Sequence, residues 1–159
     1  MTTADPIRGA LAGLAAGLVA AFAMSQAQKL FAAIGPDQGS GGSPATVKAA
    51  NRVKRTATGR SIATKDKAAA GQAVHYATGA ALGIAYGLVA EYRPEVTKGY
   101  GALFGAATSM LLDEAIIPAV GLGEPPLEVP LSSHVFGLAS HFVFGFAAEG
   151  TRSALRHRD

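Results

Sequence analysis

The chain has 159 residues, of which 49% are hydrophobic and 16% charged, with a formal net charge of +3 and no cysteine. The length suits one domain, and the lack of cysteine excludes disulfides, thiolate metal sites and cysteine nucleophiles. Most of the charges fall outside four long apolar runs, which therefore lack the polar stripe that a soluble bundle needs on its outer helices. We therefore expect an all-α integral membrane protein rather than a soluble bundle of buried helices.

Four transmembrane helices are predicted in chain order, in a single membrane domain that covers residues 1–159. They lie at about 7–34, 72–92, 99–120 and 132–151. Each run is near or above the ~20 apolar residues that a helix needs to cross a bilayer. The strict apolar and polar alternation of a transmembrane barrel is absent. The first run follows only Arg8, a weak positive region for a signal peptide, so we interpret it as a retained span.

A polar insert, residues 35–71, separates the first and second predicted helices. It starts with a linker rich in glycine, proline and serine, Gly35 to Pro44. Its second part, Ala45 to Thr58, is basic and is either a short helix on anionic lipid or a solvated loop. No aromatic residues interleave with its cations, so no nucleic-acid partner is expected. The cations of this second part are Lys48, Arg52, Lys54 and Arg55.

The two halves of the chain resemble each other, which predicts a tandem repeat of a helical hairpin. Gly9 to Gly13 matches Gly101 to Gly105, and Tyr86 to Glu91 matches Phe144 to Glu149. Chance similarity between glycine-rich helices stays an alternative. Small residues spaced by four let helix backbones approach closely in lipid. The predicted packing glycines are Gly9, Gly13, Gly17, Gly79, Gly83, Gly87, Gly101, Gly105, Gly137 and Gly145, either inside one bundle or between copies in an oligomer.

Histidines and carboxylates converge by depth in the insert-side half of the predicted bundle. His75 and His134 should lie near that surface, with His141 ~10 Å deeper at 1.5 Å per residue. Asp113 continues a small-residue stripe and should face the interior, whereas Glu114 points about 100° away. Ionisable groups inside a membrane are costly and are usually paired or functional. The candidate metal ligands are His75, Asp113, His134 and His141.

Three interpretations of this cluster stay open: a structural hydrogen bond between helices, a proton path, and a bound metal ion or haem. The spacing matches no named metal motif, so the cofactor is not identified. Pro118 removes an amide partner from the carbonyl of Glu114, which predicts a local opening or a bend there. At the other helix ends, Glu91 and Glu149 are expected to reach water beside Arg93 and Arg152.

The chain contains no phosphate-binding loop, nucleophile elbow or zinc-protease helix. The sequence therefore favours a non-enzymatic protein, although a membrane-embedded enzyme that uses Asp113 and the histidines stays an alternative. Our first hypothesis is an accessory, stress-related or small-ligand-binding bundle in the lipid bilayer, as a homo-oligomer or with a membrane-protein partner. The second is a proton or metal-ion conduit, and the third is a cofactor-bearing membrane protein. Cations on the two sides nearly cancel, so the positive-inside rule does not orient the chain.

The last ninety or so residues resemble the YagU-like family of bacterial inner-membrane proteins, whose domain is uncharacterised. The motifs that carry the likeness are Gly71-Gln72-Ala73-Val74-His75-Tyr76, Tyr86-Gly87, Ala90-Glu91, Pro118-Ala119-Val120-Gly121-Leu122, Pro125-Pro126, and Glu149 with Arg152. The resemblance implies a multi-pass protein of the plasma membrane with both termini on the cytoplasmic side. It brings no catalytic residues. The insert departs from that pattern, because its cations would then lie on the outer side.

Overall fold

A computed structural model describes residues 4–34 and 43–156, and within these residues the chain is helical with no strand. Three short 3-10 turns, Thr64–Asp66, Pro94–Thr97 and Pro126–Glu128, join the longer elements. Most of the predicted linker, residues 35–42, lies outside the described residues. The helices are α1 (Pro6–Ile34), α2 (Ala45–Thr58), α3 (Lys67–Tyr92), α4 (Ala102–Ser109), a π-helical segment (Met110–Ile116), α5 (Ile117–Ala119) and α6 (Leu131–Arg156).

Four helical stretches of the described chain are long and apolar enough to cross a membrane. They are Pro6–Ile34, Thr64–Tyr92, Ala102–Ala119 and Leu131–Arg156. The prediction of an all-α fold with four such helices is thus confirmed. Two helices extend past their predicted ends, because α3 begins at Lys67 and α6 continues to Arg156. These extensions carry polar residues, which a search for apolar runs does not include.

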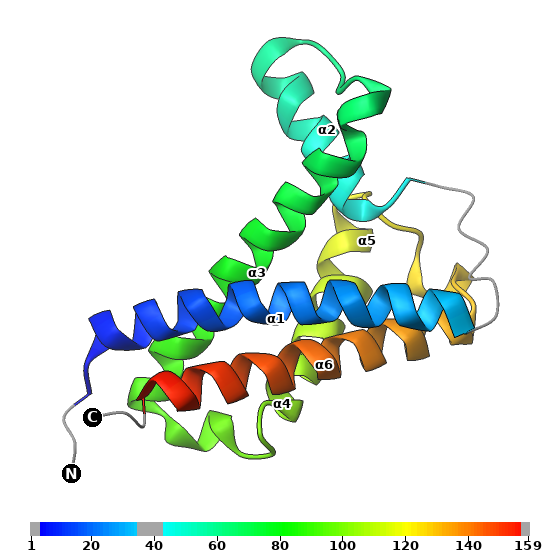
Figure 1. The fold of residues 1–159 in the computed structure, drawn as a ribbon. Helices are drawn as coiled ribbons and strands as arrows, with labels where there is room; N and C mark the ends of the chain where they lie inside the picture. The colour runs from blue at the N-terminus through cyan, green and yellow to red at the C-terminus, as the bar shows by residue number, and fades with distance from the viewer. Residues whose placement is uncertain (1–3, 35–42, 157–159) are drawn as a thin grey trace.

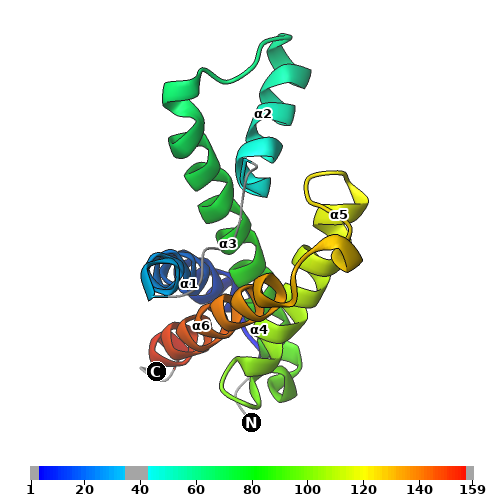
Figure 2. The ribbon, with the colours of Figure 1, turned by 90° about the vertical axis from the view of Figure 1, so that its right-hand side faces the viewer.

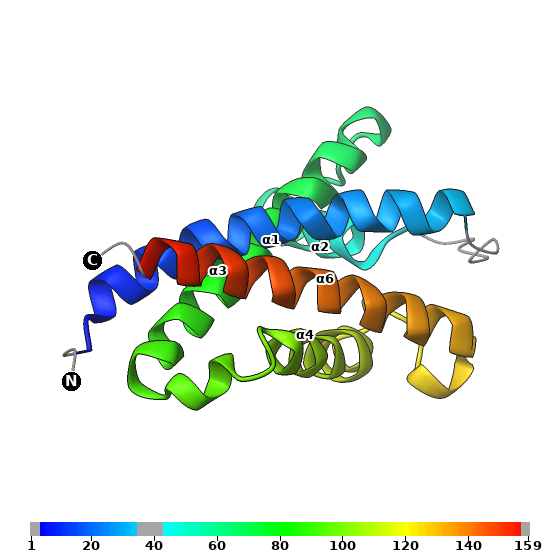
Figure 3. The same cartoon turned by 60° about the horizontal axis from the view of Figure 1, so that its bottom comes forward.

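The long helices pack in the order α3, α1, α6 and α4, with α1 and α6 lying antiparallel along each other (Figures 1 and 3). The start of α1, the end of α6 and the connection between α3 and α4 lie at one end of the bundle (Figure 1). Towards the other end, α3 and α5 diverge from the α1–α6 pair, and α2 packs beside α3 (Figure 2). The basic part of the insert is therefore a helix that covers the splayed end of the bundle.

Close backbone contact between glycines holds α1 against α3. A Cβ atom added at Gly13 would overlap the carbonyl oxygen of Gly83, and one added at Gly17 would overlap that of Gly79. The reverse also holds, because a Cβ at Gly83 would overlap the carbonyl oxygen of Gly13. Only glycine leaves room for the two helix backbones to meet in this way.

The first hairpin is α1 with α3, and the second is α4 with α6. The closest contacts of the second hairpin lie at the positions that match those of the first hairpin. Gly101 faces the carbonyl of Gly145, as Gly9 faces that of Gly87. Gly105 faces the carbonyl of His141, as Gly13 faces that of Gly83. The two hairpins therefore share a contact register as well as a sequence pattern, as a duplicated unit would.

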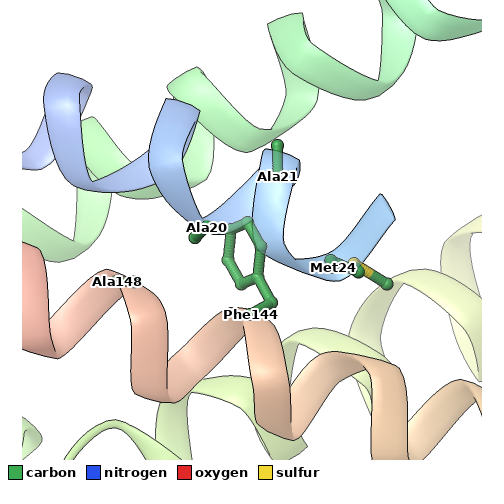
Figure 4. Close-up of a cluster of buried hydrophobic side chains, with 5 residues drawn as sticks. All are labelled: Ala20, Ala21, Met24, Phe144 and Ala148. Carbon is green, nitrogen blue, oxygen red and sulfur yellow. The ribbon is translucent and has the colours of Figure 1, made fainter. Parts of the chain in front are cut away.

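A small apolar core lies between α1 and α6. The ring of Phe144 points from α6 towards Ala20 and Met24 on α1, and its residue is only 3% exposed (Figure 4). Ala20, Ala21 and Ala148 are fully buried. The methyl group of Ala21 points away from α6, towards Gly79 of α3 (Figure 4). Outward-facing Leu, Val and Phe side chains are widely exposed on these helices, which suits a surface covered by lipid tails.

Candidate functional site: a polar corner in an intramembrane cavity

Helix α4 continues directly into a π-helical segment from Met110 to Ile116. At its end, the amide of Ile117 donates a hydrogen bond to the carbonyl of Leu112, five residues earlier. Pro118 has no amide to offer the carbonyl of Glu114, so an ordinary α-helical ladder cannot be completed here. Such π-helical turns recur at functional sites, and this one carries both acidic residues of the segment, Asp113 and Glu114.

Asp113 pairs with His141 of α6. The Oδ2 atom of Asp113 lies 3.2 Å from Nδ1 of His141, and the hydroxyl of Ser109 donates to the same oxygen over 3.4 Å. Nδ1 of His141 also lies 3.1 Å from the carbonyl oxygen of Gly137. A carbonyl can only accept, so Nδ1 carries the proton. Nε2 of a neutral His141 is then an acceptor, and it has no hydrogen-bond partner among the described residues.

The internal repeat shows that this pair replaces small residues of the first hairpin. His141 stands where the first hairpin has Gly83, because Gly105 and Gly13 approach these two residues in the same way. Asp113 stands where the first hairpin has Ala21. A Cβ added at Gly137 would meet Oδ2 of Asp113, and one added at the matching Gly79 would meet the methyl group of Ala21. The carboxylate and the imidazole thus occupy positions that the fold fills elsewhere without polar groups.

Glu114 pairs with the other histidine of α6. Its Oε1 lies 2.6 Å from Nδ1 of His134, and Nε2 of His134 donates to the carbonyl of Pro126 over 3.0 Å. The two neighbouring carboxylates therefore reach histidines that are about two turns apart on α6. Both ring nitrogens of His134 are engaged, so the residue ties the turn before α6 to the π-helical segment. It could bind a metal only by giving up one of these contacts.

His75 lies on α3 and faces α1. Its Nε2 lies 3.0 Å from the carbonyl oxygen of Ala21, to which it must donate. The Nδ1 atom of the neutral ring is therefore a second acceptor. Within residues 4–34 and 43–156, no three side chains of His, Asp or Glu gather closely enough to hold a metal ion. Of the four predicted ligands, Asp113 and His141 pair with each other, His134 pairs with Glu114, and His75 binds a carbonyl.

One cavity of about 290 Å³ is lined by His75, Asp113 and His141. Most of its wall is apolar, with Leu82 from α3 and Phe144 from α6 among the lining residues. Ala49 of α2 lines the cavity too, so the basic helix of the insert closes part of it. The polar corner that these three residues make is rich in acceptors, because the carboxylate and the free nitrogens of neutral histidines all accept hydrogen bonds.

Three aromatic rings form a layer beside the cavity, on the side of the connection between α3 and α4. The rings of Tyr86 and Phe104 stack with their centres 4.1 Å apart, and Phe104 lies 5.7 Å from Phe144. Phe144 also lines the cavity. The layer lies between the polar corner and a second polar cluster, near the C-terminal end of α6.

The second cluster centres on Glu149, whose side chain is only 6% exposed. Arg152 donates two hydrogen bonds to its carboxylate, each 2.8 Å long, and the hydroxyl of Tyr86 donates a third. The predicted partner Arg152 is confirmed, but the expectation that Glu149 reaches water is wrong. Two of the three donated hydrogen bonds come from Arg152, one turn further along α6, and the third comes from Tyr86, which reaches Glu149 from α3.

Glu91 is enclosed in a similar way at the same end of the bundle. Arg156 donates two hydrogen bonds to its carboxylate, 2.7 and 2.9 Å long, and the amide of Asp5 donates another of 3.0 Å. The expectation that Glu91 reaches water beside Arg93 is therefore wrong. Helix α3 ends at Tyr92, and it is the C-terminal turn of α6 that brings a cation to the carboxylate.

Comparison with known proteins places the chain in an uncharacterised group. No curated protein and no solved structure matches it. A family model described as "Protein of unknown function (DUF1440)" matches residues 53–150. This stretch is more than half of the chain, and it includes the second part of α2, the acidic π-helical segment and all three histidines discussed above. The chain therefore belongs to the DUF1440 family.

Proposed function

We propose that this small membrane protein binds a mainly apolar small molecule that carries one hydrogen-bond-donating end, such as an amine or a hydroxyl. The observation that carries the proposal is the cavity of about 290 Å³ with its acceptor-rich corner at Asp113, His141 and His75. Its volume is at the lower limit for small-molecule sites, which are typically apolar with a few convergent polar groups. We place the protein in the bacterial plasma membrane, as its resemblance to YagU-like proteins implies.

The chemistry of the corner favours a donor over an acceptor. Asp113 and the free nitrogens of neutral His75 and His141 would accept hydrogen bonds from an amine, whereas a carboxylate ligand would meet a like charge at Asp113. The side chain of Asp113 is 34% exposed while that of His141 is 7% exposed, so the carboxylate is the more accessible partner. The aromatic layer of Tyr86, Phe104 and Phe144 lies between the cavity and the Glu149 cluster, which supports a pocket rather than a conduit.

Three probes with one apolar chain test this assignment: octylamine, octanol and octanoate. Each is titrated by calorimetry into the protein in nanodiscs, with uptake by protein-free nanodiscs subtracted. Octylamine should bind most tightly and octanoate most weakly. Asp113→Asn removes the charge with little change of shape, and should weaken octylamine binding roughly 10- to 100-fold, as expected for one hydrogen bond to a charged group.

The matched control is Asp66→Asn, which removes an exposed carboxylate at the start of α3 and should leave binding unchanged. A second pair tests the cavity itself. Thr78→Trp fills it and should abolish binding of all three probes, whereas Ala77→Trp, on the exposed side of the same helix turn, should not. Equal affinities for octylamine and octanoate, or an Asp113→Asn variant that binds like the wild type, would overturn the proposal.

A further inference from the structure

A second pocket, of about 560 Å³, lies between α2 and the turn that follows α5. We call it the basic pocket. Three of its lining residues are the cations Lys48, Arg52 and Arg55 of α2, and Gly121 and Leu122 form its other wall. Among the described residues that line it there is no carboxylate. It is separate from the cavity at Asp113, although Leu122 borders both.

Helix geometry places the three cations on one face of α2. They stand at positions i, i+4 and i+7, which align along a helix. Like charges with this spacing repel and destabilise a helix. Arg52 also donates through Nη1 to the carbonyl of Val120 over 2.6 Å, which joins α2 to the end of α5. An anion in the basic pocket would relieve the repulsion between the cations and strengthen the contact between α2 and the end of α5.

The remaining polar groups of the basic pocket are donors as well. The side-chain oxygen of Asn51 accepts a hydrogen bond from the amide of Ile62 over 2.8 Å, so its NH2 group is the part left to donate. Arg52 keeps donors besides Nη1, and Thr56 adds a hydroxyl. Several donors around a concentration of positive charge suit the oxygens of a phosphate group.

The position of the pocket next to two candidate spans favours a lipid as the source of that phosphate. Its Gly121–Leu122 wall directly follows the candidate span Ala102–Ala119, and α2 directly precedes the span Thr64–Tyr92. With these two stretches crossing the bilayer, the pocket would lie near one end of each span, at the depth of the lipid headgroups. Basic pockets at this depth recognise anionic lipid headgroups. We propose that the basic pocket binds the phosphate of an anionic phospholipid, which clamps α2 over the splayed end of the bundle.

The test measures lipid retention in nanodiscs that contain equal amounts of phosphatidylglycerol and phosphatidylcholine. Native mass spectrometry of the released protein should show phosphatidylglycerol retained in preference to phosphatidylcholine. The triple variant Lys48→Gln, Arg52→Gln, Arg55→Gln should retain at least about tenfold less phosphatidylglycerol. The control Lys54→Gln, Arg60→Gln, Lys65→Gln removes three cations of the same insert that do not line the pocket, and should retain it as the wild type does.

Circular dichroism checks that each variant keeps its helices, and the single variants Lys48→Gln and Arg55→Gln should each show a smaller loss if the triple variant fails to fold. Equal losses in the pocket and control triple variants would overturn the proposal, because the attraction would then be a general effect of charge. Glycerol 3-phosphate, a soluble phosphate, is tested for binding to the wild type as a comparison. If it binds the wild type as tightly as phosphatidylglycerol does, the pocket serves a free phosphate and the lipid assignment fails.

Discussion

The hydroxyl of Tyr86 on α3 donates a hydrogen bond of 2.8 Å to Oε2 of Glu149 on α6, joining the two hairpins of the fold. Both residues are buried, at 4% and 5% exposure. At the position that matches Tyr86, the second hairpin has Phe144, which lies in the apolar core instead. The bond therefore belongs to the contact between hairpins, and it helps to compensate the charge of a carboxylate that is shielded from water.

Replacing Tyr86 by phenylalanine removes this bond and keeps the stacked ring. We expect Tyr86→Phe to lower the free energy of unfolding by roughly 1.5–3 kcal/mol, the usual contribution of a hydrogen bond to a charged group. Unfolding in mixed micelles, followed by circular dichroism as the fraction of denaturing detergent rises, would measure it. The control is Tyr92→Phe, whose residue is 62% exposed. Equal effects of the two variants would contradict a structural role for the bond.

The glycine contact between α1 and α3 predicts a contrast between two alanine substitutions. Gly83→Ala places a methyl group against the backbone of Gly13 and Gly17, and should destabilise the protein by roughly 1–3 kcal/mol. Gly150→Ala, on α6, meets nothing within 4 Å and should be neutral or stabilising by up to about 1 kcal/mol, because alanine favours helices. The same unfolding measurement serves for both. A Gly83→Ala protein as stable as Gly150→Ala would show that the helices do not meet there.

The ion pair between Glu91 and Arg156 predicts measurable coupling across 65 residues of chain. Its side chains are 6% and 20% exposed, so the charges are poorly screened. A double-mutant cycle with Glu91→Gln and Arg156→Gln should give a coupling energy of about 1–3 kcal/mol. The exposed pair Asp5 and Arg8 should give less than about 1 kcal/mol in the parallel cycle. Equal coupling in the two cycles would mean that Glu91 is solvated.

The four spans and the glycine faces follow from the sequence because they depend on local properties. Apolar run length predicts a span whatever its neighbours are, and spacing by four places glycines on one face in any α-helix. The contact between Asp113 and His141 could also be predicted, because counting residues along two antiparallel helices places both at a similar depth in the membrane. Each of these features needs only regular helix geometry.

The remaining contacts depend on irregular or distant structure. The prediction that Glu114 points away from Asp113 assumed 100° per residue, but the π-helical segment changes that rotation and brings Glu114 to His134. The partner of Glu91 is 65 residues away, and only the crossing of α6 identifies it. The cavity is equally non-local, because Ala49 reaches it from the insert and the other walls come from the hairpins.

The absence of cysteine from the chain makes the arrangement of the spans directly testable. With α1 and α3 both crossing, Arg60 before α3 and Thr97 after it should lie on opposite sides of the membrane. Single variants Arg60→Cys and Thr97→Cys, in sealed vesicles of one orientation, should therefore react with a membrane-impermeant maleimide from opposite sides. Ser153→Cys, near the end of α6, should react from the same side as Thr97→Cys. The chain crosses the membrane twice between these positions, through Ala102–Ala119 and Leu131–Arg156. Labelling of Arg60→Cys and Thr97→Cys from one side would mean that α3 does not cross, and the cavity would then not be enclosed by four spans.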